Sequence, residues 1–369
     1  MDHDKLFSVI DYGSANIRLG AFNYKNVGSK FITNKINFNN DENFKNLILD
    51  SENKINRHLK NLTIMVDSKY CLSVDVTIKK KLDKNTVNIK IFNNFVNEVK
   101  LQVEQNYKDY KIQHLIISKY IVDDTEYKEF IELKNIENLI IEIKFILIPS
   151  FITNNLRDLL KKSHISIINI FNSSYVKALD YNKNFEKYET KFYLDIGLEK
   201  TTLLVFKKNK LKHINFLPLG GKHVTNDIAQ VLKIEEKKAE EIKMEIQQTN
   251  ATINNEKSKQ LFIQVAHARL QEIIDLCFKS VNDLNDFKST NSVLVFTGEG
   301  SKILSKNSIF LNEDYNFFKE MSCYEESADI ICSAGQNYLL KDNLFEYFMV
   351  TKKTKKKGFF EQLFYYFNR

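Results

Sequence analysis

Short apolar runs, most of them ending in a turn, recur along the chain and predict buried strands. The clearest cover residues 7–12 and 17–24, HLIIS, IEIKFILIPSF and the first half of VLVFTGEGSKI. Residues 43–60 and the run TVNIKIFNNFVNEV predict helices between them. Strands and helices that are mixed along one chain in this way indicate an α/β fold.

A charged stretch at about 229–289 predicts further helices, and one of them carries a clear apolar stripe. In LFIQVAHARLQEIIDLCF the stripe consists of Ile263, Ala266, Leu270, Ile273, Ile274 and Cys277. Residues at this spacing share one face of a helix, so we expect them to pack inward. Arg269 and Lys279 fall off the stripe, which is typical of a solvated face.

The chain has only ten glycines, and seven of them lie in four short segments. These segments are DYGSANIRLG, DIGLEK, LPLGGKH and TGEGSK. Three of the four follow an apolar run that predicts a buried strand. A glycine after a strand permits a positive φ angle or close approach to a ligand, and the N–H groups there can form an anion-binding nest.

Two of these segments match each other at a constant offset of 184 residues. The matched pairs are Asp11 and Asp195, Gly13 and Gly197, Leu19 and Leu203, and Phe22 and Phe206. Each segment predicts a strand, an Asp, a turn with Gly and a second strand. One such hairpin is most simply a plain turn, but a matched pair indicates an internal duplication.

Two tight hairpins that face each other across a cleft can hold a polyphosphate from both sides. Backbone N–H groups and the hydroxyls of Ser14 or Thr201 would donate to phosphate oxygens, and Asp11 and Asp195 would hold a hydrated Mg²⁺. VLVFTGEGSKI adds a Gly-X-Gly loop that suits a ribose or purine, although such a loop is a weak signal by itself. Neither a P-loop nor a complete GxGxxG fingerprint occurs.

In this order the segments resemble the phosphate-1, phosphate-2 and adenosine motifs of the actin, heat-shock-70 and sugar-kinase superfamily. Within it, the chain is most similar to the FtsA family of bacterial cell-division proteins. The resemblance is carried by IDYGSANIRLG, LDIGLEKTTLLVF, HINFLPLGGKHVTNDIA, KKAEEIK, VLVFTGEGSKI and a basic amphipathic C-terminus. It implies an actin-like duplicated ATPase fold, with two lobes around a nucleotide cleft and an FtsA-type 1C subdomain.

The resemblance also implies a set of contacts for ATP and Mg²⁺. Phosphate contacts fall at Gly13, Ser14, Asn16, Gly197 and Thr201, and Mg²⁺ lies near Asp11 and Asp195. Glu240 and Lys243 flank the nucleoside, and Gly298, Gly300 and Ser301 lie under the adenine. Without the resemblance, KKAEEIK is simply a charged helical stretch.

Three departures from the family pattern affect the phosphate site. Asn16 stands where a lysine is usual, Leu198-Glu199-Lys200 replace a Gly-Gly-Thr run, and Glu299 replaces a glycine. Glu199 brings a negative charge to the phosphates, although Lys200 can compensate for it. We therefore expect ATP binding with weak or no ATPase activity, and no residue stands out as a catalytic base.

The resemblance divides the chain into two lobes and a tail. Subdomain 1A covers residues 1–75 and 148–187, subdomain 1C 76–147, subdomain 2A 188–228 and 290–350, subdomain 2B 229–289, and a basic linker with an amphipathic helix 351–369. In the FtsA family subdomain 2B receives the acidic C-terminal peptide of FtsZ, which implies a role for Arg269 in binding it. A length of 369 residues is consistent with two lobes.

The segment TKKTKKKGFFEQLFYYFNR has the pattern of an interfacial amphipathic helix. Five of the six residues 352–357 are lysines. At about 100° per residue the following apolar side chains share one face; they are Phe359, Phe360, Leu363, Phe364 and Phe367. Lysines and apolar side chains together bind an anionic membrane surface better than either alone. The alternative is a helix docked on the protein's own core, for which a run of lysines is a less natural junction.

Composition changes this interpretation little. The formal net charge of +7 does not argue for nucleic acid, because Lys, Asn, Ile, Phe and Tyr are enriched together, as in chains from AT-rich genomes. Four scattered cysteines without a CxxC pair predict reduced structural thiols and no zinc site. No apolar stretch is long enough to span a bilayer, and MDHDKLFSVI lacks the basic start of a secretory signal, so we expect the protein in the cytosol.

With these features, the resemblance to FtsA implies an actin-like ATP-binding protein of cell division. It would lie on the cytoplasmic side of the inner membrane at the division septum, anchor FtsZ filaments there, self-assemble into filaments and bind other division proteins, but not nucleic acid. Two alternatives stay open. One is a soluble phosphotransferase of the sugar-kinase type, which needs a catalytic carboxylate, and the other is a PilM-like pilus-assembly protein, which normally lacks such a tail.

Overall fold

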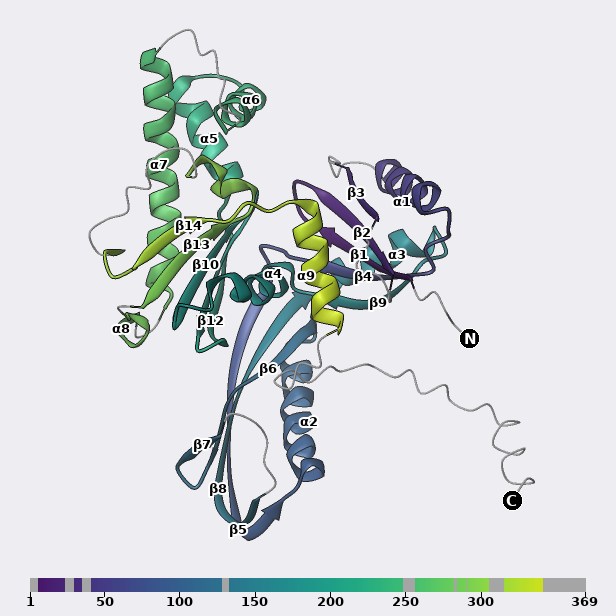
Figure 1. Cartoon of the computed structure of the whole chain (residues 1–369), viewed down its shortest axis with the longest axis vertical. Helices are drawn as coiled ribbons and strands as arrows, with labels where there is room; N and C mark the ends of the chain where they lie inside the picture. The colour runs from purple at the N-terminus through teal and green to yellow at the C-terminus, as the bar shows by residue number, and fades with distance from the viewer. Residues whose placement is uncertain are drawn as a thin grey trace, which may run out of the picture.

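The structure, a computed structural model, describes residues 6–23, 30–34, 41–127, 133–247, 256–281, 284–289, 291–304 and 315–340. Two lobes meet around helices α4 (Ser173–Tyr181) and α9 (Ala328–Leu340), and a third unit extends away from them (Figure 1). The predicted membrane tail, with Phe359, Phe360, Leu363, Phe364 and Phe367, lies outside the described residues. Within the described ranges no helix is long and apolar enough to cross a membrane.

The first lobe is built on a five-stranded sheet of order β3-β2-β1-β4-β9. Its strands are β1 (Leu6–Tyr12), β2 (Ile17–Asn23), β3 (Lys30–Asn34), β4 (Asn61–Val66) and β9 (Ser166–Phe171). The predicted β1–β2 hairpin is confirmed, and β1 also runs parallel to β4. Helices α1 (Asp41–Ile55) and α3 (Ser150–Lys161) bury Leu47 and Leu156 in one core with Ile10 of β1.

The second lobe repeats this topology in a sheet of order β12-β11-β10-β13-β14. Its strands are β10 (Thr190–Ile196), β11 (Thr201–Lys207), β12 (Lys210–Leu217), β13 (Ser292–Thr297) and β14 (Glu320–Cys323). The register of the first hairpin recurs in the second, since Leu6 opposes Asn23 and Thr190, 184 positions later, opposes Lys207. This equivalence confirms the duplication inferred from the sequence.

Helices α5 (Gly221–Leu232), α6 (Glu236–Gln247) and α7 (Glu256–Lys279) pack on the second sheet, and α8 (Leu284–Phe287) follows them. The predicted stripe of α7 is confirmed, because five of its side chains are at most 1% exposed. These five are Ala266, Leu270, Ile273, Ile274 and Cys277, and Ile263 packs beside them. Two short 3₁₀ helices also occur: η1 (Asn182–Phe185) lies between α4 and β10, and η2 (Glu299–Ile303) follows β13.

The third unit is an antiparallel sheet of order β5-β8-β6-β7 that carries one helix. Its elements are β5 (Leu72–Val87), α2 (Ile89–Asn106), β6 (Tyr110–Val122), β7 (Thr125–Tyr127) and β8 (Leu133–Pro149). The helix expected in TVNIKIFNNFVNEV begins after Asn88, whose side chain accepts a hydrogen bond from the N–H of Ile91. The end of β8 reaches both neighbouring cores through Ile146 and Ile148. The predicted domain boundaries stay predictions.

Helices α4 and α9 lie between the two main sheets and share one core with both. Val9 of the first sheet, Phe206 of the second and Ile331 of α9 belong to this core. Gly20 of β2 permits the close approach of α9, because a Cβ atom at this position would lie 2.6 Å from the Cβ of Cys332. The glycine at residue 20 is therefore needed for packing. All four cysteines are free thiols, and three of them are buried.

We expect Gly20→Ala to lower the free energy of unfolding by about 1–3 kcal/mol, because the added methyl group overpacks the contact between β2 and α9. Urea denaturation measures this change. The second substitution, Cys332→Gly, removes the Cβ atom that the methyl group meets, so the double variant should lose less stability than the two single changes add up to. Strictly additive losses would contradict this steric explanation.

Candidate functional site

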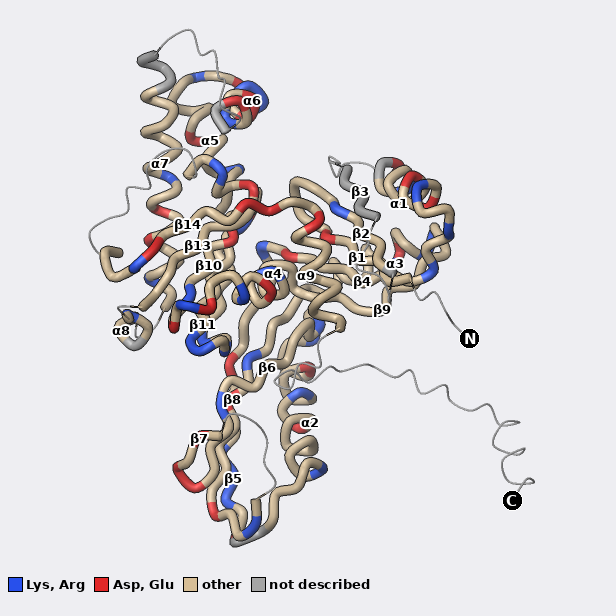
Figure 2. The backbone as a smooth tube through the Cα atoms, in the orientation of Figure 1, with Lys and Arg blue, Asp and Glu red and all other residues tan. Residues whose placement is uncertain are grey.

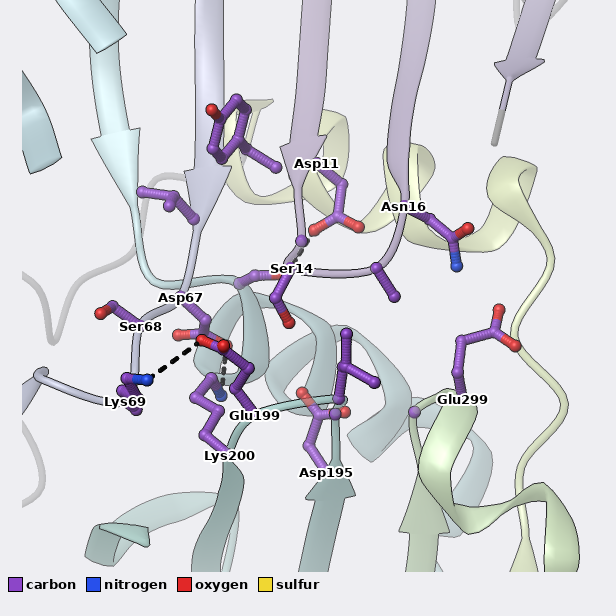
Figure 3. A pocket seen from close by; sticks show the side chains of 18 of the residues that line it. Asp11, Ser14, Asn16, Asp67, Ser68, Lys69, Asp195, Glu199, Lys200 and Glu299 are labelled. Carbon is purple, nitrogen blue, oxygen red and sulfur yellow. Dashed lines mark hydrogen bonds and ion pairs between the residues drawn. The ribbon is translucent and has the colours of Figure 1, made fainter. Parts of the chain in front are cut away.

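A cavity of about 450 Å³ lies between the two lobes, at the turns of the two duplicated hairpins. The β1–β2 turn and the end of β4 line it from the first lobe, and the β10–β11 turn and the loop after β13 line it from the second. The start of α4 also contributes to its lining. Figure 3 shows Asp11 and Asp195 on opposite sides of this space, with Lys69 and Lys200 between the lobes.

The cavity brings together seven of the site residues that the sequence predicted. They are Asp11, Gly13, Ser14, Asn16, Asp195, Gly197 and Gly298. Five others do not line it, namely Thr201, Glu240, Lys243, Gly300 and Ser301. The residues expected around the phosphates and the metal are thus largely together, while most of those expected around the nucleoside are not.

The hydroxyl groups among these five residues bind the protein itself. Thr201 Oγ1 donates to the carbonyl of Leu219 at 2.8 Å, and Ser301 Oγ donates to the carbonyl of Gly298 at 2.8 Å. Both side chains are at most 4% exposed. Neither hydroxyl therefore faces a ligand in this conformation.

Lys243 is also engaged internally. Its ammonium donates to the carbonyl of Gly221 at 3.1 Å, to Thr225 Oγ1 at 2.6 Å and to Glu240 Oε2 at 2.5 Å. Burial lowers the pKa of Lys243, although the carboxylate of Glu240 opposes this shift. Lys243 and Glu240 thus connect α6 to the start of α5 at the site expected for the nucleoside.

The glycines of the two hairpin turns and of the loops before α5 and after β13 are explained by contacts within the protein. In the first turn Gly13 N–H donates to the carbonyl of Asn16 at 3.1 Å, and in the second Gly197 N–H donates to that of Lys200 at 2.8 Å. A Cβ atom at Gly220 would lie only 2.5 Å from the carbonyl oxygen of Gly197. Gly298 has a φ angle of 85°, which other residues rarely adopt. Glycine here lets backbone segments meet each other.

Asp11 is nearly buried and is already paired with a cation. Arg18 Nη1 donates to its carboxylate at 2.8 Å, and Ser173 Oγ donates to the other oxygen at 2.6 Å. The same guanidinium donates through Nη2 to Glu299 at 3.0 Å. Although burial lowers the pKa of Arg18, the carboxylates of Asp11 and Glu299 raise it above its usual range. The guanidinium therefore neutralises Asp11.

Asp195 occupies the equivalent position in the second lobe and is paired in the same way. Lys177 Nζ lies 3.1 Å from its carboxylate and 3.1 Å from Glu326 Oε1. Burial alone would raise the pKa of Asp195, but the ammonium groups of Lys177 and Lys200 and a hydrogen bond from Ser174 lower it to about 2. Burial would likewise lower the pKa of Lys177, yet its two carboxylates raise it well above its usual range.

Asp67, which directly follows β4, was not predicted from the sequence. Its carboxylate accepts the N–H of Ser174 at 2.9 Å and the side-chain amide of Asn172, both at the start of α4, and lies 2.9 Å from Lys200 Nζ. An Asp after a buried strand that pairs with β1 was the signal that could have identified it. Arg18, Lys177 and Glu326 were also missed, because each pairs with residues distant in sequence.

The residues expected to hold Mg²⁺ do not fit a divalent cation in this arrangement. The carboxylates of Asp11 and Asp195 are neutralised by Arg18 and Lys177, whose charged groups lie where a cation would approach them. Among the described residues no group of three or more His, Cys, Asp or Glu side chains could hold a metal ion. The expected magnesium site is thus not supported by this geometry.

We expect Asp195→Asn to lower the free energy of unfolding by roughly 2–3 kcal/mol at pH 7 and by less at pH 3. The folded pKa lies below the unfolded value of about 3.9, so the stabilisation is complete above pH 4 and is lost as the pH falls through about 2. Urea denaturation at both pH values measures it. Glu104→Gln, at an exposed ion pair of α2, serves as control. An equal cost at pH 7 and pH 3 would contradict the assignment.

Comparison with known proteins supports the relation suggested by the hairpins. The family model described as cell division protein FtsA matches residues 192–301. Cell division protein FtsA of Borreliella burgdorferi is 25% identical over 211 residues, which cover 52% of this chain and 51% of that protein. FtsA of Streptococcus pneumoniae is 25% identical over 140 residues, covering 36% and 31%. The chain thus spans about a third to a half of the length of the curated relatives it matches.

A solved structure, a PilM–PilN type IV pilus biogenesis complex, has a similar fold. It superposes with a TM-score of 0.62 at 12% identity and covers 92% of this chain and 93% of its own. At this identity the similarity shows the fold alone. Together with the duplicated hairpins, these comparisons show that the chain has an actin-like fold and that its second lobe is similar to the FtsA family.

Proposed function

We propose that this protein is an actin-like component of the bacterial division machinery that binds ATP between its lobes and anchors FtsZ filaments to the cytoplasmic membrane. The observation that carries the proposal is the pair of hairpins of identical register that meet at one cavity. The match of the FtsA family model to residues 192–301, which include the second hairpin, supports it. Self-assembly into filaments at the septum and contacts with other division proteins belong to the same proposal.

ATP would bind with its phosphates between the Gly13 and Gly197 turns. Both turns line the cavity, and backbone N–H groups of such turns can bind anions. The four cations of the cavity are committed to carboxylates, so binding requires phosphate oxygens to replace some of those partners. This requirement is consistent with weak or absent ATPase activity.

Membrane attachment rests on the sequence of the C-terminal segment. The lysines in residues 352–357 would contribute roughly 1 kcal/mol each near an anionic surface, and each inserted aromatic or leucine side chain up to about 1.5–3 kcal/mol. Many such anchors in one filament would add avidity. The protein would then be peripheral to the inner membrane on its cytoplasmic side.

A cavity of about 320 Å³ between α5 and α7 is a candidate site for the FtsZ C-terminal peptide. Val231, Val265 and Ala268 line it next to Arg269. The guanidinium of Arg269 pairs with Asp227, at 2.5 Å from Nε to Oδ2, and with Glu272, at 2.6 Å from Nη1 to Oε2. An acidic peptide would have to displace Asp227 and Glu272 from the guanidinium of Arg269. We therefore assign Arg269 a contribution to peptide binding in addition to that of the apolar side chains.

The second candidate function is that of a PilM-like pilus-assembly protein, which the similarity in fold favours. A soluble phosphotransferase is less well supported, because a catalytic carboxylate would have to act as a base while Asp11, Asp67 and Asp195 are each paired with a cation. The membrane experiment below separates both from the division protein.

We expect the full chain to sediment with anionic lipid vesicles and a chain ending at Leu340 to stay in the supernatant. The matched variant Phe360→Asp with Phe364→Asp keeps every lysine and should reduce the partition coefficient by at least about tenfold, because the apolar face is lost. Sedimentation with ATP added measures the avidity from assembly. If the full chain stays in solution under all conditions, the pilus-type or phosphotransferase function becomes the better proposal.

We expect Val231→Asp and Arg269→Gln each to weaken binding of a labelled FtsZ C-terminal peptide by about threefold to tenfold, measured by fluorescence polarisation. Val231 is 49% exposed, so its substitution should leave the fold intact. Lys238→Gln, on the exposed face of α6, is the control for a general loss of positive charge. Equal binding by all four proteins would place the peptide elsewhere.

A further inference from the structure

Besides the Lys177–Asp195 pair made by α4, three ion pairs among the described residues join the two lobes across the cleft. They are Arg18 Nη2 to Glu299 Oε1 at 3.0 Å, Lys69 Nζ to Glu199 Oε2 at 3.5 Å and Lys200 Nζ to Asp67 Oδ2 at 2.9 Å. The first-lobe members lie near the start of β2 or in the loop after β4, and the second-lobe members lie in the β10–β11 turn or at the start of η2. Two of these pairs are drawn in Figure 3, which shows Lys69 and Lys200 reaching toward carboxylates of the opposite lobe.

The second-lobe members of these pairs are Glu199, Lys200 and Glu299. All three are charged residues at positions where the resemblance to the FtsA family implies glycine or threonine. Each takes part in a different interlobe pair. The departures therefore share one structural effect, which is to place charge where the lobes face each other.

The cations of the cavity are all committed to carboxylates. Besides Arg18, Lys69 and Lys200, the cavity is lined by Lys177, which bridges Asp195 and Glu326. Six carboxylates and four cations line the cavity, so its formal charge is already negative without a ligand. Basic and acidic residues are accordingly interspersed where the lobes meet (Figure 2). A polyphosphate is therefore not required to balance the cations of this site.

The three pairs differ in exposure, which sets how salt affects them. In the inner pair, the side chains of Lys200 and Asp67 are both 9% exposed. The two outer pairs are more exposed: Lys69 and Glu199 are 33% and 39% exposed, and Arg18 and Glu299 are 12% and 28% exposed. Salt screens exposed pairs strongly and buried pairs little. The inner pair is further supported by Ser174 and Asn172 of α4, which donate to Asp67.

We infer that these three ion pairs, here called the interlobe latch, hold the two lobes closed in the absence of nucleotide and divalent metal. In this protein Arg18, Lys69 and Lys200 then bridge the lobes, and a nucleotide enters by displacing Asp67 and Glu199 from Lys200 and Lys69. The lobes can then close without a bound ligand. The latch involves residues of the cleft alone and does not depend on membrane binding by the tail.

The test measures the distance between the lobes in the full chain by double electron–electron resonance. Nitroxide labels at Lys54→Cys in α1 and Lys237→Cys in α6 occupy exposed positions, one in each lobe. Cys323→Ser removes the one partly buried thiol, since the other three cysteines are buried. Spectra are recorded with EDTA and without nucleotide, and again with Mg²⁺ and ATP.

We expect a single closed population in EDTA that Mg²⁺ and ATP do not narrow further. Glu199→Gln with Glu299→Gln removes both outer pairs while preserving side-chain size, and should raise the ratio of open to closed molecules by roughly twofold to tenfold. The matched control Glu98→Gln removes an ion pair within the third unit and should leave the distance unchanged.

Two results would overturn the inference. One is a broad distribution in EDTA that closes only with Mg²⁺ and ATP, and the other is a double variant that matches the unmodified protein. Circular dichroism verifies that the variants are folded. Measuring the distance distribution of the unsubstituted latch while NaCl is raised to 1 M repeats the test, because salt should weaken the outer ion pairs. Failure of vesicle binding with an intact latch would instead refute the proposed function.

Discussion

A buried carboxylate needs a cation, and at Asp195 this requirement determines how the two lobes meet. The penalty for burying an unpaired carboxylate is several kcal/mol, so Lys177 must stay within reach of it. Lys177 lies on α4 and also pairs with Glu326, which lies just before the start of α9. The two helices between the sheets are thus oriented by one ammonium group as well as by their apolar core.

The duplicated hairpins could be predicted because their signal is local. A buried strand, an Asp, a turn with Gly and a second strand occur within about 17 residues, and the same order recurs at a fixed offset. The helical stripe of α7 was predictable for the same reason, since its period depends only on neighbouring turns of one helix. The lengths of β5 and β8 could not be predicted, because these strands pair through residues distant in sequence, from Val87 with Leu133 to Leu72 with Leu147.

The charge partners of the site could not be predicted for the opposite reason. Arg18 and Glu299 are 281 positions apart, and nothing near either residue indicates the other. The nucleoside residues were transferred from the family by position, which does not determine where a side chain points. Lys243 therefore stood at the expected place in the sequence while its ammonium binds Gly221, Thr225 and Glu240.

The two hairpins share a backbone but no longer share their charges. Asn16 corresponds to Lys200 at the offset of 184 residues, and Arg18 corresponds to Thr202, so each repeat supplies its cation from a different position. The halves can therefore no longer exchange roles. A substitution that removes a charge from one hairpin therefore has no counterpart at the equivalent position of the other hairpin.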